Sequence, residues 1–107
     1  MSQRVCFKLR INPEFVDEYK QRHAEVWPEM LTALSESGWT NYSLFVAPDG
    51  ELIGYLECED LAKSLELMGR TEVNTRWQAS VAKFFVGLDG RAADDAIRPL
   101  EEVFHLD

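Results

Sequence analysis

Two apolar runs joined by a tight turn constrain the fold of this chain most strongly. Residues 40–47 and 52–58 flank Pro48-Asp49-Gly50, and alternating apolar runs around such a turn are typical of a β-hairpin. Both strands carry apolar side chains on both faces, for example Leu44 on one and Phe45 on the other. Helices covering one side of the sheet would leave the second apolar face in water. We therefore expect a second copy of the chain to pack there, giving a homodimer.

Segments before the hairpin predict a strand and a helix. Alternating apolar residues at positions 4–11 predict the strand, and Asn12-Pro13-Glu14 predicts the helix start that follows it. Apolar residues then recur every three or four positions, which predicts one amphipathic helix to about Ser37. Pro28 falls inside this stretch, so we expect a kink there.

Segments after the hairpin predict two helices and a last strand. Asp60 is expected to cap a short helix, and Thr71 a longer one that carries Trp77 on its apolar face. Residues 87–99 predict a polar loop that holds Asp94 in solvent, and residues 100–106 predict the strand. The resulting order is β-α-β-β-α-β, an α+β ferredoxin-like fold with an antiparallel sheet. A chain of 107 residues fits a single domain, residues 1–107.

Composition limits the classes of partner. The formal net charge is −8, from 11 Lys and Arg against 19 Asp and Glu, and the basic residues do not cluster. Nucleic acids and anionic membranes are therefore not expected partners. The chain shows neither a signal peptide nor a membrane-spanning run, and Cys6 and Cys58 belong to no metal motif. We expect a cytoplasmic protein, without cofactor or metal, whose partner is a neutral small molecule or another protein.

His23 is the residue with the clearest chemical potential. It lies one helical turn after Tyr19 on the apolar face, where a histidine is more often a packed core residue than a catalyst. Three features favour catalysis: the neighbouring hydroxyl of Tyr19, an imidazole that titrates near neutrality, and a concentration of aromatic residues. Aromatic faces beside a few hydroxyls suit sugars, although each aromatic ring could instead be ordinary core. The aromatic residues in question are Trp27, Trp39, Tyr42, Tyr55 and Trp77.

The segment from Tyr19 to Glu29, with the pattern Tyr-x-x-x-His-x-x-x-Trp-Pro, resembles the L-rhamnose mutarotases. The similarity extends over nearly the whole chain. It includes the helix start at Asn12-Pro13, Asn41-Tyr42, Arg76-Trp77 and the C-terminal segment Leu100-Glu101-Glu102-Val103-Phe104. The resemblance implies a dimeric α/β-barrel of ferredoxin-like subunits. It also implies cofactor-free interconversion of the α and β anomers of L-rhamnose or a closely related sugar.

By this resemblance His23 is the catalytic proton donor, and Tyr19, Tyr42 and Trp77 contact the sugar. Two features depart from the family's best-known members. Gln78 follows Trp77 where they have a second tryptophan, and residues 87–91 replace an Asn-Pro-Asp-Asn-Ser-Pro segment. Both changes bear on which sugar is bound. Two alternative functions remain open. A cofactor-free monooxygenase of the same dimeric fold would consume oxygen. A non-catalytic sugar-binding module would bind the sugar without accelerating anomer exchange.

Overall fold

A computed structural model describes residues 2–107 of the chain. Strand β1 (Gln3–Arg10) leads through a single 3-10 turn, η1 (Pro13–Phe15), into helices α1 (Val16–Ala24) and α2 (Pro28–Glu36). The hairpin strands β2 (Thr40–Val46) and β3 (Glu51–Cys58) follow, then helices α3 (Leu61–Gly69) and α4 (Glu72–Val81). Two short 3-10 turns, η2 (Ala82–Phe84) and η3 (Ala93–Ala96), precede the C-terminal tail. The chain is thus a small α+β protein.

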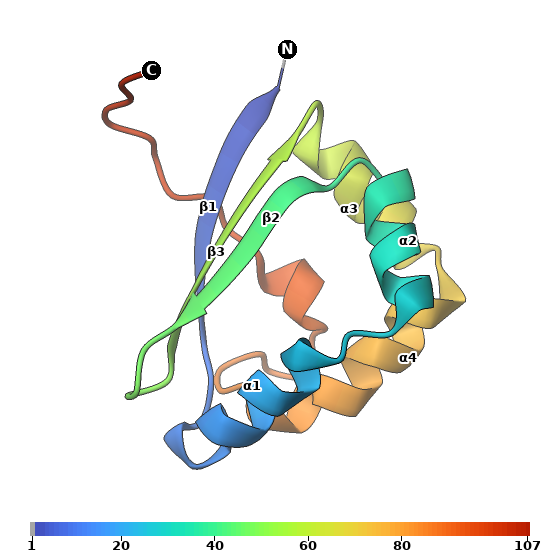
Figure 1. Cartoon of the computed structure of the whole chain (residues 1–107), viewed down its shortest axis with the longest axis vertical. Coiled ribbons are helices and arrows are strands. Elements are labelled where there is room, and N and C mark those ends of the chain that lie inside the picture. Colours follow the sequence, from blue (N-terminus) through green and yellow to red (C-terminus); the bar gives the residue numbers. More distant parts are fainter. Residues whose placement is uncertain (1) are drawn as a thin grey trace.

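The three strands form an antiparallel sheet in the order β1-β3-β2. The helices lie against one face of this sheet, and its other face carries none of them (Figure 1). The largest fully buried side chains include Phe7 and Leu56 of the sheet, Phe84 of η2 and Met68 of α3. The core therefore lies between the sheet and the helical layer.

The opening strand, the hairpin and the two helix caps confirm the sequence predictions. The side chain of Asp60 accepts a hydrogen bond from the amide of Lys63 (3.2 Å), and that of Thr71 accepts one from the amide of Asn74 (3.2 Å). Each bond satisfies an amide that has no partner inside its own helix. No helix among residues 2–107 is long and apolar enough to cross a membrane.

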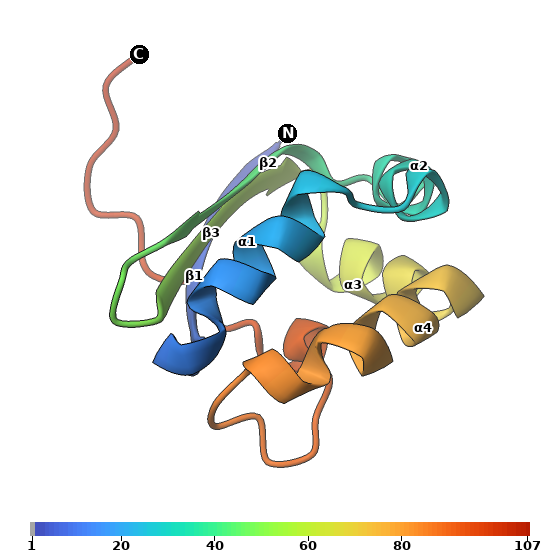
Figure 2. The ribbon, with the colours of Figure 1, turned by 60° about the horizontal axis from the view of Figure 1, so that its bottom comes forward.

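The long first helix of the prediction is two helices. The chain leaves helical geometry at Glu25, and Pro28 is the first residue of α2 rather than a kink within one helix. Proline lacks the amide hydrogen needed inside a helix but fits its first turn, and it holds the preceding residue, Trp27, in an extended conformation. Figure 2 shows the resulting change of direction between α1 and α2. Trp27 is consequently placed between the two helices.

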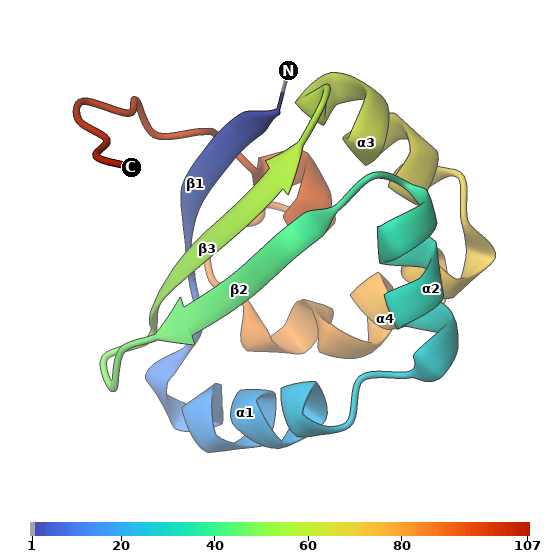
Figure 3. The same ribbon diagram turned by 45° about the horizontal axis from the view of Figure 1, so that its top comes forward.

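The predicted last strand, residues 100–106, is wrong for this chain. The tail contacts β1 through one backbone bond, from the amide of Leu100 to the carbonyl oxygen of Cys6 (2.7 Å), and then leaves the sheet (Figure 3). Val103 and Phe104 are 89% and 79% exposed. A strand needs a ladder of hydrogen bonds and an apolar surface to cover its side chains, and the tail finds neither within one subunit.

Candidate active site

His23 lies in the last turn of α1, beside the break that Pro28 imposes. Its Nδ1 is 3.0 Å from the carbonyl oxygen of Tyr19. Because a carbonyl oxygen only accepts, Nδ1 must carry the hydrogen, and Nε2 of the neutral ring then holds a lone pair. Nε2 has no hydrogen-bond partner in the described part of the chain. The imidazole is therefore held in the tautomer that leaves Nε2 free to accept a proton.

The electrostatic environment keeps this imidazole neutral. Burial lowers the pKa of His23 below its ordinary value, and the positive charge of Arg22 lowers it further. The bond to the Tyr19 carbonyl raises the pKa but does not outweigh burial. A charged imidazolium loses hydration when buried, whereas the neutral ring loses little. His23 is thus uncharged at neutral pH and able to act as a base.

Aromatic rings fix the orientation of His23. The Tyr19 ring lies 4.2 Å from it between ring centres, and Trp77 packs edge to face at 5.5 Å. Trp77 is itself held by Trp27 at 5.0 Å and by the Arg22 guanidinium 5.4 Å above its ring. Arg22 in turn donates a 2.7 Å hydrogen bond to the Ser80 hydroxyl. These contacts restrain the imidazole.

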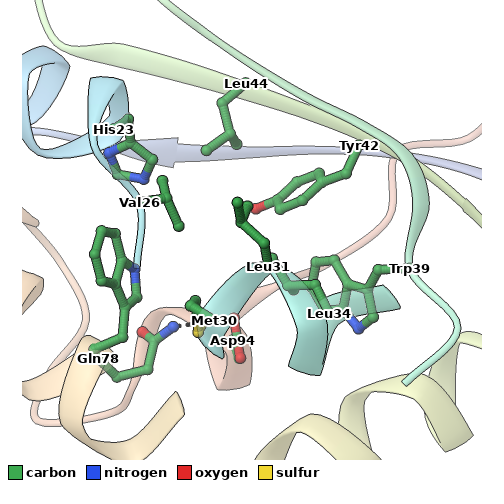
Figure 4. A pocket seen from close by; sticks show the side chains of 11 residues that line it. His23, Val26, Met30, Leu31, Leu34, Trp39, Tyr42, Leu44, Gln78 and Asp94 are labelled. Atoms are coloured by element: carbon green, nitrogen blue, oxygen red, sulfur yellow. Dashed lines mark hydrogen bonds between the residues drawn. The ribbon is translucent and has the colours of Figure 1, made fainter. Parts of the chain in front are cut away.

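His23 opens onto a cavity of about 320 Å³, at the lower end of the size range of small-molecule sites. Tyr42 of β2 and Trp77 of α4 line it together with His23, and Met30 and Leu34 of α2 form an apolar wall. Figure 4 shows His23 and Tyr42 converging on this space from α1 and β2. The cavity therefore combines aromatic surface with an imidazole and a hydroxyl.

A bulge in β2 sets the position of Tyr42. The register with β3 shifts between Thr40 and Ser43, and Asn41 has a φ of +50°, a conformation that asparagine tolerates better than most residues. The Tyr42 ring packs on Trp39 at 4.9 Å, and the hydroxyl points into the cavity. Although the residue as a whole is 36% exposed, burial of the hydroxyl raises the pKa of Tyr42 well above its usual range. The hydroxyl is therefore a hydrogen-bond donor at neutral pH.

Three of the four predicted site residues, His23, Tyr42 and Trp77, line the cavity of about 320 Å³. Tyr19 lies behind His23 and lines a smaller adjoining cavity of about 40 Å³, which His23, Tyr42 and Trp77 also border. Burial raises the pKa of Tyr19 above its usual range. Tyr19 is thus placed to orient His23 and to reach the inner end of the site.

Asp94 is a site residue that sequence patterns did not reveal. The polar composition of residues 87–99 predicts a solvent-exposed loop, yet η3 folds beneath α4 and the Asp94 carboxyl lines both cavities. The neighbouring Ala93 and Ile97 are 7% and 5% exposed, so they anchor the turn in the core. These apolar residues within an otherwise polar loop were the available signal.

No group of three His, Cys, Asp or Glu side chains in residues 2–107 is arranged to hold a metal ion. The expected absence of a metal or cofactor remains a prediction. The functional groups that the site does present are a neutral imidazole, phenolic hydroxyls, the carboxamide of Gln78 and one carboxyl group. These groups suit proton transfer to and from a neutral ligand.

Fold and site together define a small α+β protein whose aromatic pocket holds a neutral imidazole, a phenol and a carboxyl group. The sequence model described as L-rhamnose mutarotase matches residues 4–106. The chain belongs to the L-rhamnose mutarotase family. It is 37% identical to the L-rhamnose mutarotase of Oceanobacillus iheyensis, over 98% of this chain and 99% of that one. It is 41% identical to that of Bacillus subtilis, over 91% of each chain.

A solved structure shares the fold. The crystal structure of L-rhamnose mutarotase FA22100 from Formosa agariphila superimposes with a TM-score of 0.74 at 28% identity. The match covers 98% of this chain and 99% of the other. The family predicted from Tyr19, His23 and the Trp27-Pro28 pair is therefore confirmed.

Proposed function

We propose that this protein is an isomerase that interconverts the α and β anomers of L-rhamnose, with His23 as its central acid/base. The observation that carries the proposal is the neutral His23 imidazole, whose Nε2 is unprotonated beside a cavity lined by Tyr42 and Trp77. Family membership supplies the reaction class and the sugar. The apolar wall of Met30 and Leu34 suits the methyl group of a 6-deoxy sugar.

The reaction moves protons and exchanges one C–O bond. Nε2 of His23 removes the proton of the anomeric hydroxyl. A solvent water molecule gives a proton to the ring oxygen as the C1–O5 bond breaks and C1 becomes an aldehyde. Rotation about C1–C2 then presents the other face of the carbonyl to the C5 hydroxyl. On reclosure the C5 hydroxyl returns its proton to the hydroxide left by that water molecule, and the imidazolium of His23 returns one to the new anomeric oxygen. Transfers of this kind by a placed side chain contribute about 10²- to 10⁴-fold.

The remaining predicted residues bind the sugar. The Trp77 ring offers an apolar surface to the C–H face of the pyranose, as aromatic rings do in many ligand sites. The un-ionised Tyr42 hydroxyl can donate a hydrogen bond to the ring oxygen while that atom gains charge. Tyr19, stacked 4.2 Å behind His23 between ring centres, keeps the imidazole aimed at the anomeric carbon and meets the inner edge of the sugar.

The test is NMR saturation transfer between the two anomeric proton signals of L-rhamnose, with and without protein. Exchange catalysed by the wild type should fall about 10²- to 10⁴-fold in His23→Ala. His105→Ala is the matched control, because His105 lies in the exposed tail outside the cavity. A fully active His23→Ala would remove His23 from the reaction. Binding of L-rhamnose without catalysed exchange would favour a binding module, and oxygen consumption would favour a monooxygenase.

The helix-free face of the sheet supports a homodimer, which we include in the proposal. Phe45 is 63% exposed there, beside the half-buried Ile53 and Tyr55. The same face carries an ion pair between Lys8 on β1 and Glu51 on β3 (3.6 Å). A face with apolar residues and both signs of charge can pair with its own copy across a two-fold axis. Two such sheets packed face to face would form the dimeric α/β-barrel of ferredoxin-like subunits.

The dimer is tested by the mass of the protein in solution. Sedimentation equilibrium should give twice the chain mass for the wild type and a single chain mass for Phe45→Glu, since a buried unpaired charge disfavours the interface. Ala79→Glu adds the same charge on the exposed side of α4 and should remain dimeric. A monomeric wild type at micromolar concentration would contradict the proposal.

A further inference from the structure

A polar cluster of three side chains forms one wall of the cavity. Asn74 and Gln78 project from α4 one turn apart, and Asp94 comes from η3. The Nδ2 of Asn74 donates to Oδ2 of Asp94 at 3.1 Å, and the Nε2 of Gln78 donates to Oδ1 at 3.4 Å. Asn74 is only 5% exposed, whereas Gln78 and Asp94 line the cavity directly. The cluster is therefore part of the site.

The Asp94 carboxyl retains hydrogen-bonding capacity. Its two oxygens offer about four lone-pair directions, and two amide groups use two of them. No basic side chain in the described residues forms an ion pair with Asp94, and burial raises its pKa above the ordinary value. A buried carboxylate without a cation is costly, and further donors would offset the cost. Hydroxyl groups of a bound ligand would supply those donors.

Gln78 and Asn74 hold the carboxyl in place. The Oε1 of Gln78 accepts a 3.2 Å hydrogen bond from the amide of Ala93, at the start of η3, and its Nε2 also donates to Oδ1 of Asn74 at 3.3 Å. Gln78 thereby ties η3 to α4, directly beside the residue whose carboxyl lines the cavity. Asn74 and Gln78 are positioning residues for Asp94.

The location of the cluster indicates which hydroxyls it meets. His23 and Asp94 lie on different sides of the pocket in Figure 4, and both border the same cavity. A pyranose that presents C1 and O5 to His23 directs its C3–C4 edge away from His23, because these two bonds are opposite each other in a six-membered ring. That edge carries two adjacent hydroxyls in L-rhamnose. Two adjacent hydroxyls match the two oxygens of one carboxyl group.

We propose that Asp94, positioned by Gln78 and Asn74, is a specificity-determining residue that binds the C3 and C4 hydroxyls of the sugar. The inference rests on the proposed function for the orientation of the ring. It assigns the polar wall of the cavity to recognition and His23 to proton transfer. Gln78 stands where the family's best-known members have a second tryptophan, and the inference makes it a residue that positions Asp94.

The experiment compares L-rhamnose with its 3-deoxy and 4-deoxy analogues. For each sugar, kcat/KM for anomer exchange is divided by the uncatalysed rate, which removes intrinsic differences in reactivity. The wild type should discriminate against at least one deoxy analogue by about 10- to 150-fold, the size expected for a hydrogen bond to a charged group. Asp94→Asn and Asp94→Ala should reduce this ratio to within about threefold of unity, mainly by raising KM for L-rhamnose.

Controls separate recognition from folding. Asp95→Asn changes an exposed neighbour on η3 and should keep the wild-type ratio. Gln78→Leu leaves the carboxyl but removes its tie to α4, and should lower the ratio partly. Circular dichroism and thermal melts establish that each variant is folded. Unchanged discrimination in folded Asp94→Asn, or none in the wild type, overturns the inference while leaving the mutarotase proposal intact.

Equilibrium binding makes the two proposals distinguishable. Isothermal titration of the same three sugars needs no turnover. A wild type that does not accelerate anomer exchange contradicts the proposed function. The inference still stands if that protein binds L-rhamnose more tightly than a deoxy analogue and loses this preference in Asp94→Asn. If the wild type binds none of the three sugars, the inference is overturned as well.

Discussion

Replacing Gly54 by alanine tests how the sheet forms the floor of the site. Gly54 pairs with Phe7 across β1 and β3, and the Phe7 ring lies over the position where a side chain would begin. A Cβ built on Gly54 would be 2.2 Å from Cζ of Phe7, and 2.6 Å and 2.7 Å from its two Cε atoms. To reach an ordinary contact, the ring would have to retreat by about 1.2 Å or more.

The retreat is costly because Phe7 is only 1% exposed. The space beside it is the inner cavity of about 40 Å³ that Tyr19 and His23 also line. Overpacking of this kind costs about 1 to 3 kcal/mol, and each kcal/mol lowers the melting temperature of a domain this size by about 4 to 8 °C. We expect Gly54→Ala to melt about 4 to 24 °C lower and to exchange L-rhamnose anomers more slowly.

Two further variants make the test decisive. Gly69→Ala places the same methyl group where no atom lies within 4 Å, at the end of α3, and should stabilise the protein by about 0.5 to 1 kcal/mol. Phe7→Leu should relieve the clash, so the double variant with Gly54→Ala should lose less stability than the two single losses together. If Gly54→Ala melted at or above the wild-type temperature, the proposed contact between the two strands would be refuted.

Two predictions concern pH. The pKa of His23 lies below its ordinary value of 6.5. We therefore expect kcat/KM to be constant near neutrality and to fall as pH drops through a value under 6.5, where the base becomes protonated. A fall in kcat/KM centred above pH 6.5 would contradict a buried His23 base. The pKa of Asp94 is raised, so the folded state binds that proton more tightly than the unfolded state, whose Asp titrates near 3.8. Urea unfolding measures the difference in unfolding free energy between the wild type and Asp94→Asn. This difference should shift in favour of the wild type as pH falls from 7 to 4. A difference that stays constant would argue against a buried carboxyl.

Local signals predicted most of the fold. The caps at Asp60 and Thr71 and the turn at Pro48-Asp49-Gly50 act over a few residues, so the sequence shows them directly. Pro28 is recognisable as a disruption, but whether it kinks a helix or begins a new one depends on whether α2 has a separate surface to cover. The tail after Pro99 has strand-like alternation, yet whether it forms a strand depends on neighbours that the local sequence does not contain.

The candidate site was predictable where its residues share one periodic element. Tyr19 and His23 lie one turn apart on α1, and this spacing places two side chains next to each other on any α-helix. Asp94 gave no such signal, because it enters the cavity only when η3 folds beneath α4. That contact combines the burial of Ala93 and Ile97 with a long-range hydrogen bond, which the Gln78 side chain accepts from the amide of Ala93 (3.2 Å), fifteen residues along the chain. Long-range hydrogen bonds of side chains have no periodicity, so pattern analysis cannot find them.

Burial acts on the two ionisable ends of the cavity in a way that fits a neutral substrate. It lowers the pKa of His23 and raises that of Asp94, so in both cases it disfavours the charged form. A negatively charged sugar would need a fixed positive charge, and neither the neutral His23 imidazole nor the Asp94 carboxyl provides one. A neutral polyol instead supplies hydroxyl donors to Asp94 and a removable proton to His23. Proton uptake by O5, coupled to proton loss at O1, then avoids a large change of net charge inside a pocket where such a change is expensive.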